Sequence, residues 1–480
     1  MGNAALKAAT ERALPQDGEI AAGSYSERIS AFVAGLSFDA LPTAVVESAK
    51  RHLLDTLGVG IVGSAQDNAR SALAGVRGIG GASGNSQIWG TAARLGAPYA
   101  AIANGVACHV LEYDDTHTDS ITHGSAVLVP AVLAVAEQLG RSGQELITAY
   151  VAGWEVTARV GLAARGSFHK RGFHTTSVAG VFGAAAAAAR LLGLSAGQTG
   201  HALGLAGSQV SGVSEYLSNG SSAKSFHPGW AACGGIIAAQ MARAGMTGPL
   251  TVFEGRYGTF KAYGFVDECD LAALDGELGD RWEVTRVSIK PYPCCHFAHA
   301  FIDCVLALRS QGVTPKAIES LYCVVPEIEL PLICEPFAQK LRPDSPYAAK
   351  FSLPFLLAAT LTDGRIDHNT FMQQNVASPE LLELANRVSY RVAEPGETTF
   401  PKYFPGWVEA RLRDGRVLLE RLDINTGNPD NPLSRADVEA KFRSNVSGVL
   451  GDSKAEAVIS RVNDLDRGSA ADLAQALAQD

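Results

Sequence analysis

Residues 180–194 read GVFGAAAAAARLLGL, with six consecutive alanines and a single charged side chain, Arg190. The stretch is apolar on every side rather than along one stripe, which is typical of a helix buried inside a large bundle. Small side chains also allow neighbouring helix axes to approach closely. We therefore predict a central buried helix here. Ala, Gly, Leu and Val continue to dominate in blocks of helical length over about residues 95–246, so the surrounding region is predicted to be a helical core.

The regions upstream and downstream of this core have different patterns. Apolar stripes at residues 29–36 and 46–57 predict two amphipathic helices, and the polar residues 1–24 predict a flexible N-terminal arm. After Gly264 the pattern becomes mixed, with helical patterns at 301–310 and 348–361 and strand patterns at 284–289, 320–325, 408–412 and 417–419, the last two flanking the turn signal Asp414-Gly415. Residues 435–450 and 454–478 return to helical periodicity.

These patterns predict a mainly α protein in which a large all-helical domain carries an inserted, smaller α+β lid domain. The helical domain is predicted to comprise residues 25–264 and to be completed by the C-terminal helices of residues 429–480. The α+β domain is predicted to span residues 265–428. Runs of strands interleaved with helices are typical of such a unit.

Composition excludes several classes of protein. The chain has 480 residues, 47% of them hydrophobic, and a net charge of -9 without a basic run that could follow a phosphate backbone. The apolar runs at 126–136 and 178–189 are too short to span a bilayer. The eight cysteines lack the spacing of a disulfide framework. We therefore expect a soluble, cytoplasmic protein with reduced cysteines that binds neither nucleic acid nor membrane.

Four short motifs suggest cofactors or nucleophiles, and each has a simpler interpretation. Residues 78–81 lack the strand that precedes a dinucleotide loop, and Ser195 of a G-x-S-x-G match is better explained as a helix cap with Gln198. Ser221 to Lys224 matches S-x-x-K without the motifs that accompany it in serine acylases. The cysteines and histidines at 294–299 lack the spacing of a zinc site. No metal and no organic cofactor are predicted.

Four polar clusters stand out within the apolar sequence, at residues 112–125, 170–177, 221–228 and 290–296. They hold carboxylates, imidazoles and lysines, which are costly to bury without partners. Helix caps or solvated loops are the alternative interpretation. Together the clusters supply cations to hold carboxylates and imidazoles to move protons, which favours cofactor-free proton transfer at a carbon next to a carboxylate. Isolated histidines such as His109 are interpreted as structural.

The chain resembles the MmgE/PrpD family from about Ser26 to Leu450. The resemblance is carried by motifs in one order: LLDTLG at 53–58, Asn104-Gly105 leading into EYDDTH at 112–117, Phe173-His174 with SVAG at 177–180, Lys224 with Gly229, EGRYG at 254–258, and KPYPCC at 290–295. The family includes 2-methylcitrate dehydratases, cis-aconitate decarboxylases and iminodisuccinate epimerases. It implies a large helical domain with a smaller α+β lid, and its members are commonly homodimers.

The resemblance also implies site residues. The family's catalytic positions fall on His123, His174, Lys224 and Lys290, and its substrate-binding positions on Glu112, Asp114, Thr116 and Cys295. In this implied site the lysines bind substrate carboxylates and the histidines exchange protons at the reacting carbon. Relative to the family's vertebrate decarboxylases, Cys295 replaces a histidine, Phe355 replaces a tyrosine, and His123 lies one residue further from Thr116.

The residues and the resemblance together predict a cofactor-independent, homodimeric lyase. Its substrate would be a small di- or tricarboxylate, and its reaction would combine proton transfer α to a carboxylate with elimination, as in a dehydratase or a decarboxylase. Epimerisation of an iminodisuccinate-like acid is an alternative, because it begins with the same carbanion-like state. An inactive helical binding or scaffold protein is the alternative of another class.

Overall fold

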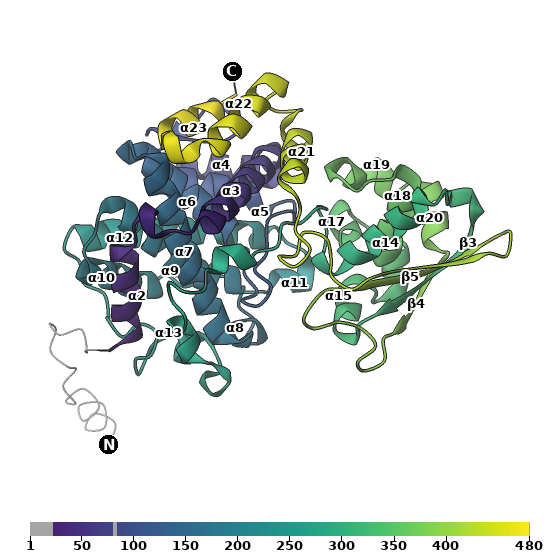
Figure 1. Ribbon diagram of the computed structural model, residues 1–480, viewed down its shortest axis with the longest axis horizontal. Coiled ribbons are helices and arrows are strands. Elements are labelled where there is room, and N and C mark those ends of the chain that lie inside the picture. The colour runs from purple at the N-terminus through teal and green to yellow at the C-terminus, as the bar shows by residue number, and fades with distance from the viewer. Residues whose placement is uncertain (1–22, 80–83, 480) are drawn as a thin grey trace.

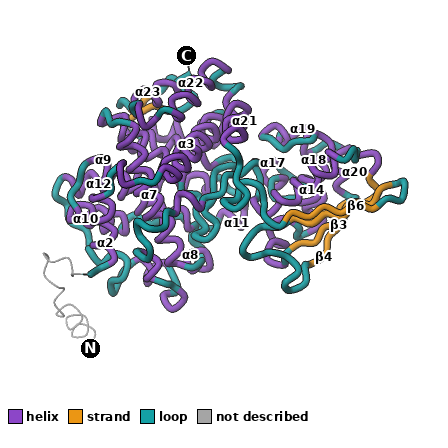
Figure 2. Tube along the Cα trace, viewed as in Figure 1, coloured by secondary structure: helices purple, strands orange, loops and turns teal. Residues whose placement is uncertain are grey.

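The computed structural model describes residues 23–79 and 84–479. The predicted arm of residues 1–24 lies outside the described residues except for its last two positions, and so do Gly80 and Gly81 of the dinucleotide-like stretch. Figure 1 shows a large helical body and a smaller part that carries a sheet at its far end. Within the described residues, strands longer than two residues are confined to this smaller part, and loops gather between the two parts (Figure 2). The structure is mainly α with a smaller α+β domain, which confirms the predicted fold class.

The helical body contains helices α2 to α13 and a short hairpin of two-residue strands, β1 and β2, paired antiparallel. Their bounds are α2 Tyr25–Gly35, α3 Thr43–Ser64, α4 Asp67–Gly78, β1 Ser86–Gln87, β2 Arg94–Leu95, α5 Ala97–His109, α6 Ser125–Leu139, α7 Gly143–Ala164, α8 Ser167–Lys170, α9 Thr175–Leu192, α10 Ala196–Gly207, α11 Tyr216–Asn219, α12 Ala223–Arg243 and α13 Thr259–Tyr263. Short 3-10 helices are η1 Phe38–Ala40, η2 Val266–Glu268, η3 Leu271–Leu274, η4 Glu283–Arg286, η5 His296–Ala298, η6 Pro315–Ala317, η7 Glu327–Glu329, η8 His368–Phe371 and η9 Leu465–Arg467.

Helix α9 is the centre of this body, as the alanine-rich stretch predicts. It packs against α2, α6, α7, α10 and α12, and all six alanines of residues 184–189 are buried. By length and composition α9 could cross a membrane, because the helix is longer than the apolar run at 178–189. Its residues are, however, almost entirely covered by the neighbouring helices. The predicted cap before the next helix is confirmed: Ser195 and Gln198 form a capping box that opens α10.

Glycines set the distances between the central helices. A Cβ atom on Gly183 of α9 would collide with the hydroxyl of Thr157 and the carbonyl oxygen of Gly153, both on α7. Similarly, a Cβ on Gly229 of α12 would collide with the Ile102 carbonyl on α5. These helices therefore approach one another to distances that only glycine permits.

The α+β domain holds one four-stranded sheet in the order β4-β3-β5-β6. Strand β3 pairs parallel with β4 and antiparallel with β5, and β5 pairs antiparallel with β6 across the predicted Asp414-Gly415 turn. Helices α14 and α18 cover the sheet and enclose a second hydrophobic core. The bounds are α14 His299–Ser310, β3 Ile318–Val325, α15 Leu330–Ile333, α16 Phe337–Leu341, α17 Pro346–Ala349, α18 Leu353–Asp363, α19 Gln373–Val376, α20 Pro379–Ala385, β4 Val388–Val392, β5 Gly406–Leu412 and β6 Val417–Leu422.

The chain then returns to the helical body. Helices α21 Arg435–Val446 and α22 Asp452–Asn463 pack on α3, and α23 Ala470–Ala476 packs on α6. In Figure 1 these last helices lie over the N-terminal helix α3. The α+β domain is therefore enclosed in sequence by two parts of one helical domain.

Two local predictions were wrong. Residues 284–289 form no strand: η4 takes the first half, and Ser288 makes only an isolated pair with Thr116. The helix predicted over 348–361 is broken between α17 and α18, because the Ser352 side chain accepts a hydrogen bond from the amide of Phe355 and starts a new helix. The break leaves Lys350 in the turn that connects the two helices.

The close approach of α7 and α9 makes a prediction. Gly183→Ala should lower the free energy of unfolding by ~1–3 kcal/mol, the usual cost of overpacking a tight core. Gly75→Ala is the matched control, because Gly75 is exposed on α4 and a methyl group added there would have no neighbour within 4 Å. Its replacement should stabilise by roughly 0.5–1 kcal/mol. Thermal and denaturant unfolding of both variants compares them, and a neutral Gly183→Ala would contradict the packing argument.

Candidate active site

The site is built on the loop of residues 110–124, which joins α5 to α6. Glu112 and Ile121 both have left-handed backbone conformations, with φ of 57° and 56°. Such conformations cost a residue other than glycine on the order of 1–3 kcal/mol and persist only when the surroundings enforce them. Here Thr116 exchanges two backbone hydrogen bonds with Ser288, at 2.9 and 2.8 Å. The loop is therefore held in place by a segment distant in sequence.

Glu112 joins the helical domain to the α+β domain. Its two carboxylate oxygens accept hydrogen bonds from Lys224 Nζ at 2.6 and 2.5 Å, and Oε1 also accepts one from the Tyr347 hydroxyl at 3.2 Å. Its backbone carbonyl accepts one from Lys290 Nζ at 3.1 Å. Burial alone would raise the pKa of Glu112, but the charges of Lys224, His109 and Lys290 outweigh it and lower that pKa below its usual range. Glu112 is therefore a buried carboxylate.

Three imidazoles gather beside Glu112. The ring of His109 lies 5.1 Å from that of His123 and 5.4 Å from that of His174, measured between centroids. His109 Nδ1 is 2.6 Å from Asp114 Oδ2, and both side chains are fully buried. His174 Nδ1 is 3.2 Å from Nδ1 of a fourth histidine, His227 on α12. The two histidines predicted as catalytic, His123 and His174, are thus near one another, and His109 lies beside both.

The ends of helices position these rings. His109 is the last residue of α5, and His174 is the N-cap residue of α9, with its amide donating to the Gly212 carbonyl at 2.8 Å. The amide of His123 donates to Thr176 Oγ1 in the first turn of α9, at 3.0 Å, and its Nδ1 lies 2.9 Å from the Asp115 carbonyl oxygen. The cluster is therefore anchored to the buried central helix.

Electrostatics divides the cluster into neutral and charged groups. Burial lowers the pKa of His123 to about 3, although Asp114 partly opposes the shift, and burial with the neighbouring His109 lowers the pKa of His174 well below its usual value. Burial alone would raise the pKa of Asp114, but His109 and His123 lower it. At neutral pH His123 and His174 are neutral imidazoles beside an ionised carboxylate.

A cavity of about 320 Å³ opens at this point. It is lined by residues from four helices and two loops, namely Asn68, His109, Val110, Glu112, Gly220, Ser221, Ser222, Lys224, Ser225 and Tyr347. Its volume lies within the range of small-molecule sites. Hydroxyl groups, an ammonium group and an imidazole together can bind carboxylate groups by charge-assisted hydrogen bonds.

Lys350 belongs to the site and was missed by the sequence analysis. Its Nζ is buried and donates to the Leu111 carbonyl at 2.5 Å. Burial lowers the pKa of Lys350 to about 8, although Glu112 opposes the shift. The sequence signal that could have placed Lys350 in a turn is Ser352, because a serine cap begins a new helix and separates it from the preceding one. Tyr347, on the same segment, was missed for the same reason.

The remaining predicted residues occupy different positions relative to the cavity. Thr116 Oγ1 lies 3.1 Å from His123 Nδ1, so Thr116 contacts the imidazole cluster. The amide of Cys295 donates to the Lys350 carbonyl at 3.0 Å, and burial raises the pKa of the Cys295 thiol to about 11. Lys170, from the second polar cluster, instead pairs with Glu268 at the surface and takes no part in the site.

The cluster at 294–299 is held by ordinary hydrogen bonds. His296 Nε2 accepts from Asn425 Nδ2 at 2.9 Å, and His299 Nε2 lies 3.3 Å from the Cys294 carbonyl oxygen. Within residues 23–79 and 84–479 no group of three or more His, Cys, Asp or Glu side chains is arranged to hold a metal ion. None of the residues at 294–299 is among those that line the cavity.

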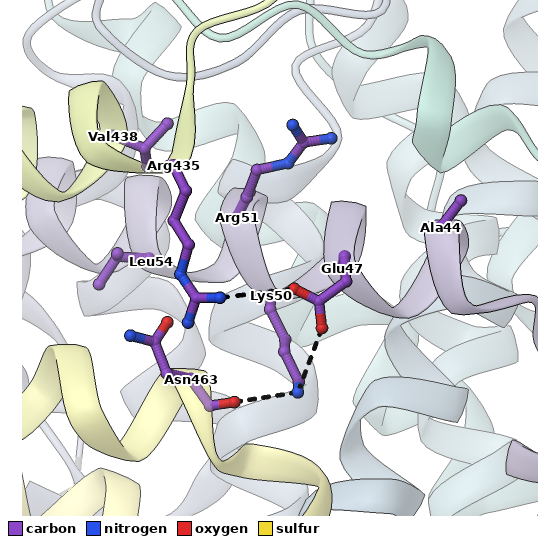
Figure 3. A pocket seen from close by; sticks show the side chains of 8 residues that line it. All are labelled: Ala44, Glu47, Lys50, Arg51, Leu54, Arg435, Val438 and Asn463. Atoms are coloured by element: carbon purple, nitrogen blue, oxygen red, sulfur yellow. Dashed lines mark hydrogen bonds and ion pairs between the residues drawn. The ribbon is translucent and has the colours of Figure 1, made fainter.

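A second polar cavity, of about 260 Å³, lies where α3 meets α21 and α22 (Figure 3). Two of its three basic side chains are paired: Lys50 Nζ bonds to the Asn463 carbonyl at 3.0 Å and lies 3.5 Å from Glu47, and Arg435 lies 3.8 Å from Glu47. Arg51 is the third basic residue of the lining. Unlike the cavity beside Glu112, this cavity has no imidazole among the described residues that line it.

One turn along the same helices, a buried ion pair reaches the site. Lys441 of α21 lies 2.6 Å from Asp55 of α3, and its Nζ also donates to the carbonyls of Lys290, at 2.7 Å, and Tyr113, at 3.3 Å. Both charged side chains are almost fully buried. Lys441 therefore ties the C-terminal helices to the two segments that carry Glu112 and Lys290.

A helical body, an inserted α+β domain and a buried cluster of carboxylates, imidazoles and lysines between them define a two-domain acid/base enzyme. The chain matches the MmgE/PrpD N-terminal domain over residues 27–271 and the MmgE/PrpD C-terminal domain over residues 292–467. It therefore belongs to the MmgE/PrpD family, as the motifs predict, and it is a lyase of the decarboxylase or dehydratase type.

Relatives of known activity match almost the whole chain. Cis-aconitate decarboxylase of Mus musculus is 30% identical over 459 residues, which cover 92% of this chain and 91% of that protein. Cis-aconitate decarboxylase of Homo sapiens is 30% identical, with 92% of each chain covered. Cis-aconitate decarboxylase of Aspergillus terreus is 26% identical, covering 94% of this chain and 95% of that protein.

The buried pair beneath the site makes a second prediction. Lys441→Met should destabilise the protein by ~3–5 kcal/mol, because it leaves the Asp55 charge buried without its partner. The double variant Asp55→Asn/Lys441→Met removes both charges and should regain much of this loss. Denaturant unfolding of the three proteins measures the difference. Equal midpoints for wild type and Lys441→Met would show that the pair is not coupled to folding.

Proposed function

We propose that this enzyme transfers a proton at a carbon next to a carboxylate of a small tricarboxylate related to cis-aconitate, with loss of CO₂. One observation carries the proposal: three lysine ammonium groups converge on two adjacent residues beside the imidazole cluster. Lys224 binds the Glu112 side chain, Lys290 binds the Glu112 carbonyl, and Lys350 binds the Leu111 carbonyl.

The charges around the cavity favour an anion with several carboxylate groups. Among the described residues, Glu112 and Asp114 are the carboxylates closest to the three lysines, and the Glu112 side chain bonds to Lys224 and Tyr347. Within the part of the chain that the structure describes, Lys290 and Lys350 donate their hydrogen bonds to carbonyl oxygens, which are neutral acceptors. Substrate carboxylates that approach these ammonium groups would gain charge-assisted hydrogen bonds. The pKa of Lys350, about 8 without substrate, would then rise and keep the group charged.

The proposed step balances without a cofactor. The bond between the reacting carbon and one carboxylate group breaks, CO₂ leaves, and the electron pair stays on carbon, delocalised toward a second carboxylate held by a lysine. An imidazole of the cluster then delivers a proton to that carbon. His123 and His174 are proposed for proton exchange, because their rings lie 6.2 Å apart beside His109, and the negative charge of a bound substrate would favour their protonated forms.

The relatives support this choice of substrate. Three proteins named cis-aconitate decarboxylase, from mammals and a fungus, align with this chain over more than nine tenths of its length. A dehydratase would place the same cations and imidazoles around a similar acid but expel water. The two reactions therefore differ in the product rather than in the groups that bind the substrate.

The reaction itself is the third prediction. Incubation with cis-aconitate in D₂O should release CO₂ and yield a dicarboxylate that carries one deuterium from solvent, observed by ¹H NMR. Citrate-like and aspartate-like acids tested in parallel identify other reactions. Formation or loss of a double bond with exchange of water indicates a dehydratase, and deuterium exchange without CO₂ or water loss indicates an epimerase. No change in any acid would favour a binding protein.

The role of Lys224 is the fourth prediction. Lys224→Met should raise KM by about tenfold or more, since a hydrogen bond to a charged group contributes roughly 1.5–3 kcal/mol. The single variant leaves Glu112 unpaired, so Glu112→Gln/Lys224→Met serves as a second variant without an isolated buried charge. Lys261→Met, on an exposed position of α13, is the control and should match wild type. Unchanged KM in a folded double variant would remove Lys224 from substrate binding.

A further inference from the structure

His109 differs from the other histidines of the site in how its two nitrogens are used. Nδ1 is 2.6 Å from the Asp114 carboxylate, whereas Nε2 is buried and has no hydrogen-bond partner among the described residues. A buried polar atom without a partner costs free energy, of order 1–3 kcal/mol. His109 is one of the residues that line the cavity, together with Lys224, Glu112 and Tyr347, and its side chain is fully buried. A ligand in that cavity could supply the missing partner.

Asp114 determines which nitrogen of the His109 ring carries the proton. Because the pKa of Asp114 is lowered by His109 and His123 against the effect of burial, the group is an ionised carboxylate that accepts the Nδ1 proton. A carboxylate in this position orients an imidazole, sets its tautomer and stabilises the imidazolium when Nε2 is also protonated. Nε2 is therefore the atom of His109 that can exchange a proton.

Among the residues that the structure describes, the imidazoles of His123 and His174 have no carboxylate as close as Asp114 is to His109. His123 Nδ1 lies near a carbonyl oxygen and the Thr116 hydroxyl, and the Asp114 carboxylate is 3.8 Å away. His174 Nδ1 faces His227 Nδ1, which is also an imidazole. Among the described residues that line the cavity, His109 is the imidazole present, and His123 and His174 lie outside this lining. Its position and its carboxylate partner distinguish it from both.

We propose that His109, held by Asp114, contacts the substrate through Nε2 and transfers a proton at the reacting carbon. This inference rests on the proposed function, because it assigns a third imidazole to the same proton-transfer step. In the decarboxylation, the carbon–carboxylate bond breaks and CO₂ leaves with the electron pair remaining on carbon. The Nε2–H bond of the imidazolium then breaks, the new C–H bond forms, and the neutral ring regains a proton from solvent.

His109→Asn separates this role from a structural one. The asparagine amide nitrogen can take the place of Nδ1 and donate to Asp114, so the fold should be retained, but nothing replaces Nε2. We expect kcat to fall by ~10²-fold or more, the usual contribution of a positioned acid or base, with KM within about threefold of wild type. His109→Gln places an amide near the position of Nε2. Because an amide cannot act as an acid or a base at neutral pH, this variant should be equally slow.

His201→Asn is the matched control. His201 lies on α10 with Nδ1 3.1 Å from the Gly248 carbonyl oxygen, away from the site, and its replacement should leave both constants unchanged. If wild type is active and folded His109→Asn keeps kcat within about threefold of it, the proposal is wrong. If all variants and wild type fail on every acid, the proposed function is wrong instead.

A second measurement decides the proposal even without turnover. ¹⁵N NMR of the imidazoles, with His109 assigned by its loss in His109→Asn, should show a proton on Nδ1. Addition of tricarballylate, a saturated tricarboxylate that cannot react, should shift the Nε2 resonance. A ring protonated on Nε2 alone, or an Nε2 resonance that tricarballylate leaves in place, would overturn the assignment.

Discussion

The interaction on which the rest of the structure depends is the set of hydrogen bonds around Glu112. Its side chain binds Lys224 of the helical body and Tyr347 of the α+β domain, and its carbonyl binds Lys290 of the connecting segment. Three parts of the chain, far apart in sequence, thus meet at one residue with a left-handed backbone. Loss of Lys224 would leave the buried Glu112 charge without its cation, and loss of Lys290 would remove a donor from the Glu112 carbonyl, so the segments are coupled through the site itself.

The apolar surroundings give these polar groups their chemical character. Alanines and glycines of α9 and α12 are buried and pack closely against the neighbouring helices. In such a medium burial lowers the pKa of an imidazole and a lysine, as for His123 and Lys350. The same medium strengthens each ion pair, which explains why carboxylates such as Glu112 and Asp114 remain ionised beside cations. The close packing of this fold therefore also sets the acid/base properties of its buried polar groups.

The elements of the fold were largely predictable because their signals are local. The alanine-rich stretch, the Asp414-Gly415 hairpin and the Ser195 cap each depend on residues within a few positions of one another, and all three form as predicted. The failures arose where a tertiary contact competed with a local pattern. Residues 284–289 alternate like a strand, but within the described part of the chain they pair with Thr116 alone, so no strand forms.

The sequence by itself determined the fold class, the family and where the polar clusters lie along the chain, because composition and motif order carry that information. Only the tertiary structure decided which members of those clusters face one cavity. His109, interpreted from sequence as structural, became central because the end of α5 places it 2.6 Å from Asp114, and Lys350 entered the site because a helix broke beside it. Lys170, equally prominent in sequence, lies at the surface instead. The direction in which a side chain points depends on helix ends and turns that are fixed only when the domains pack.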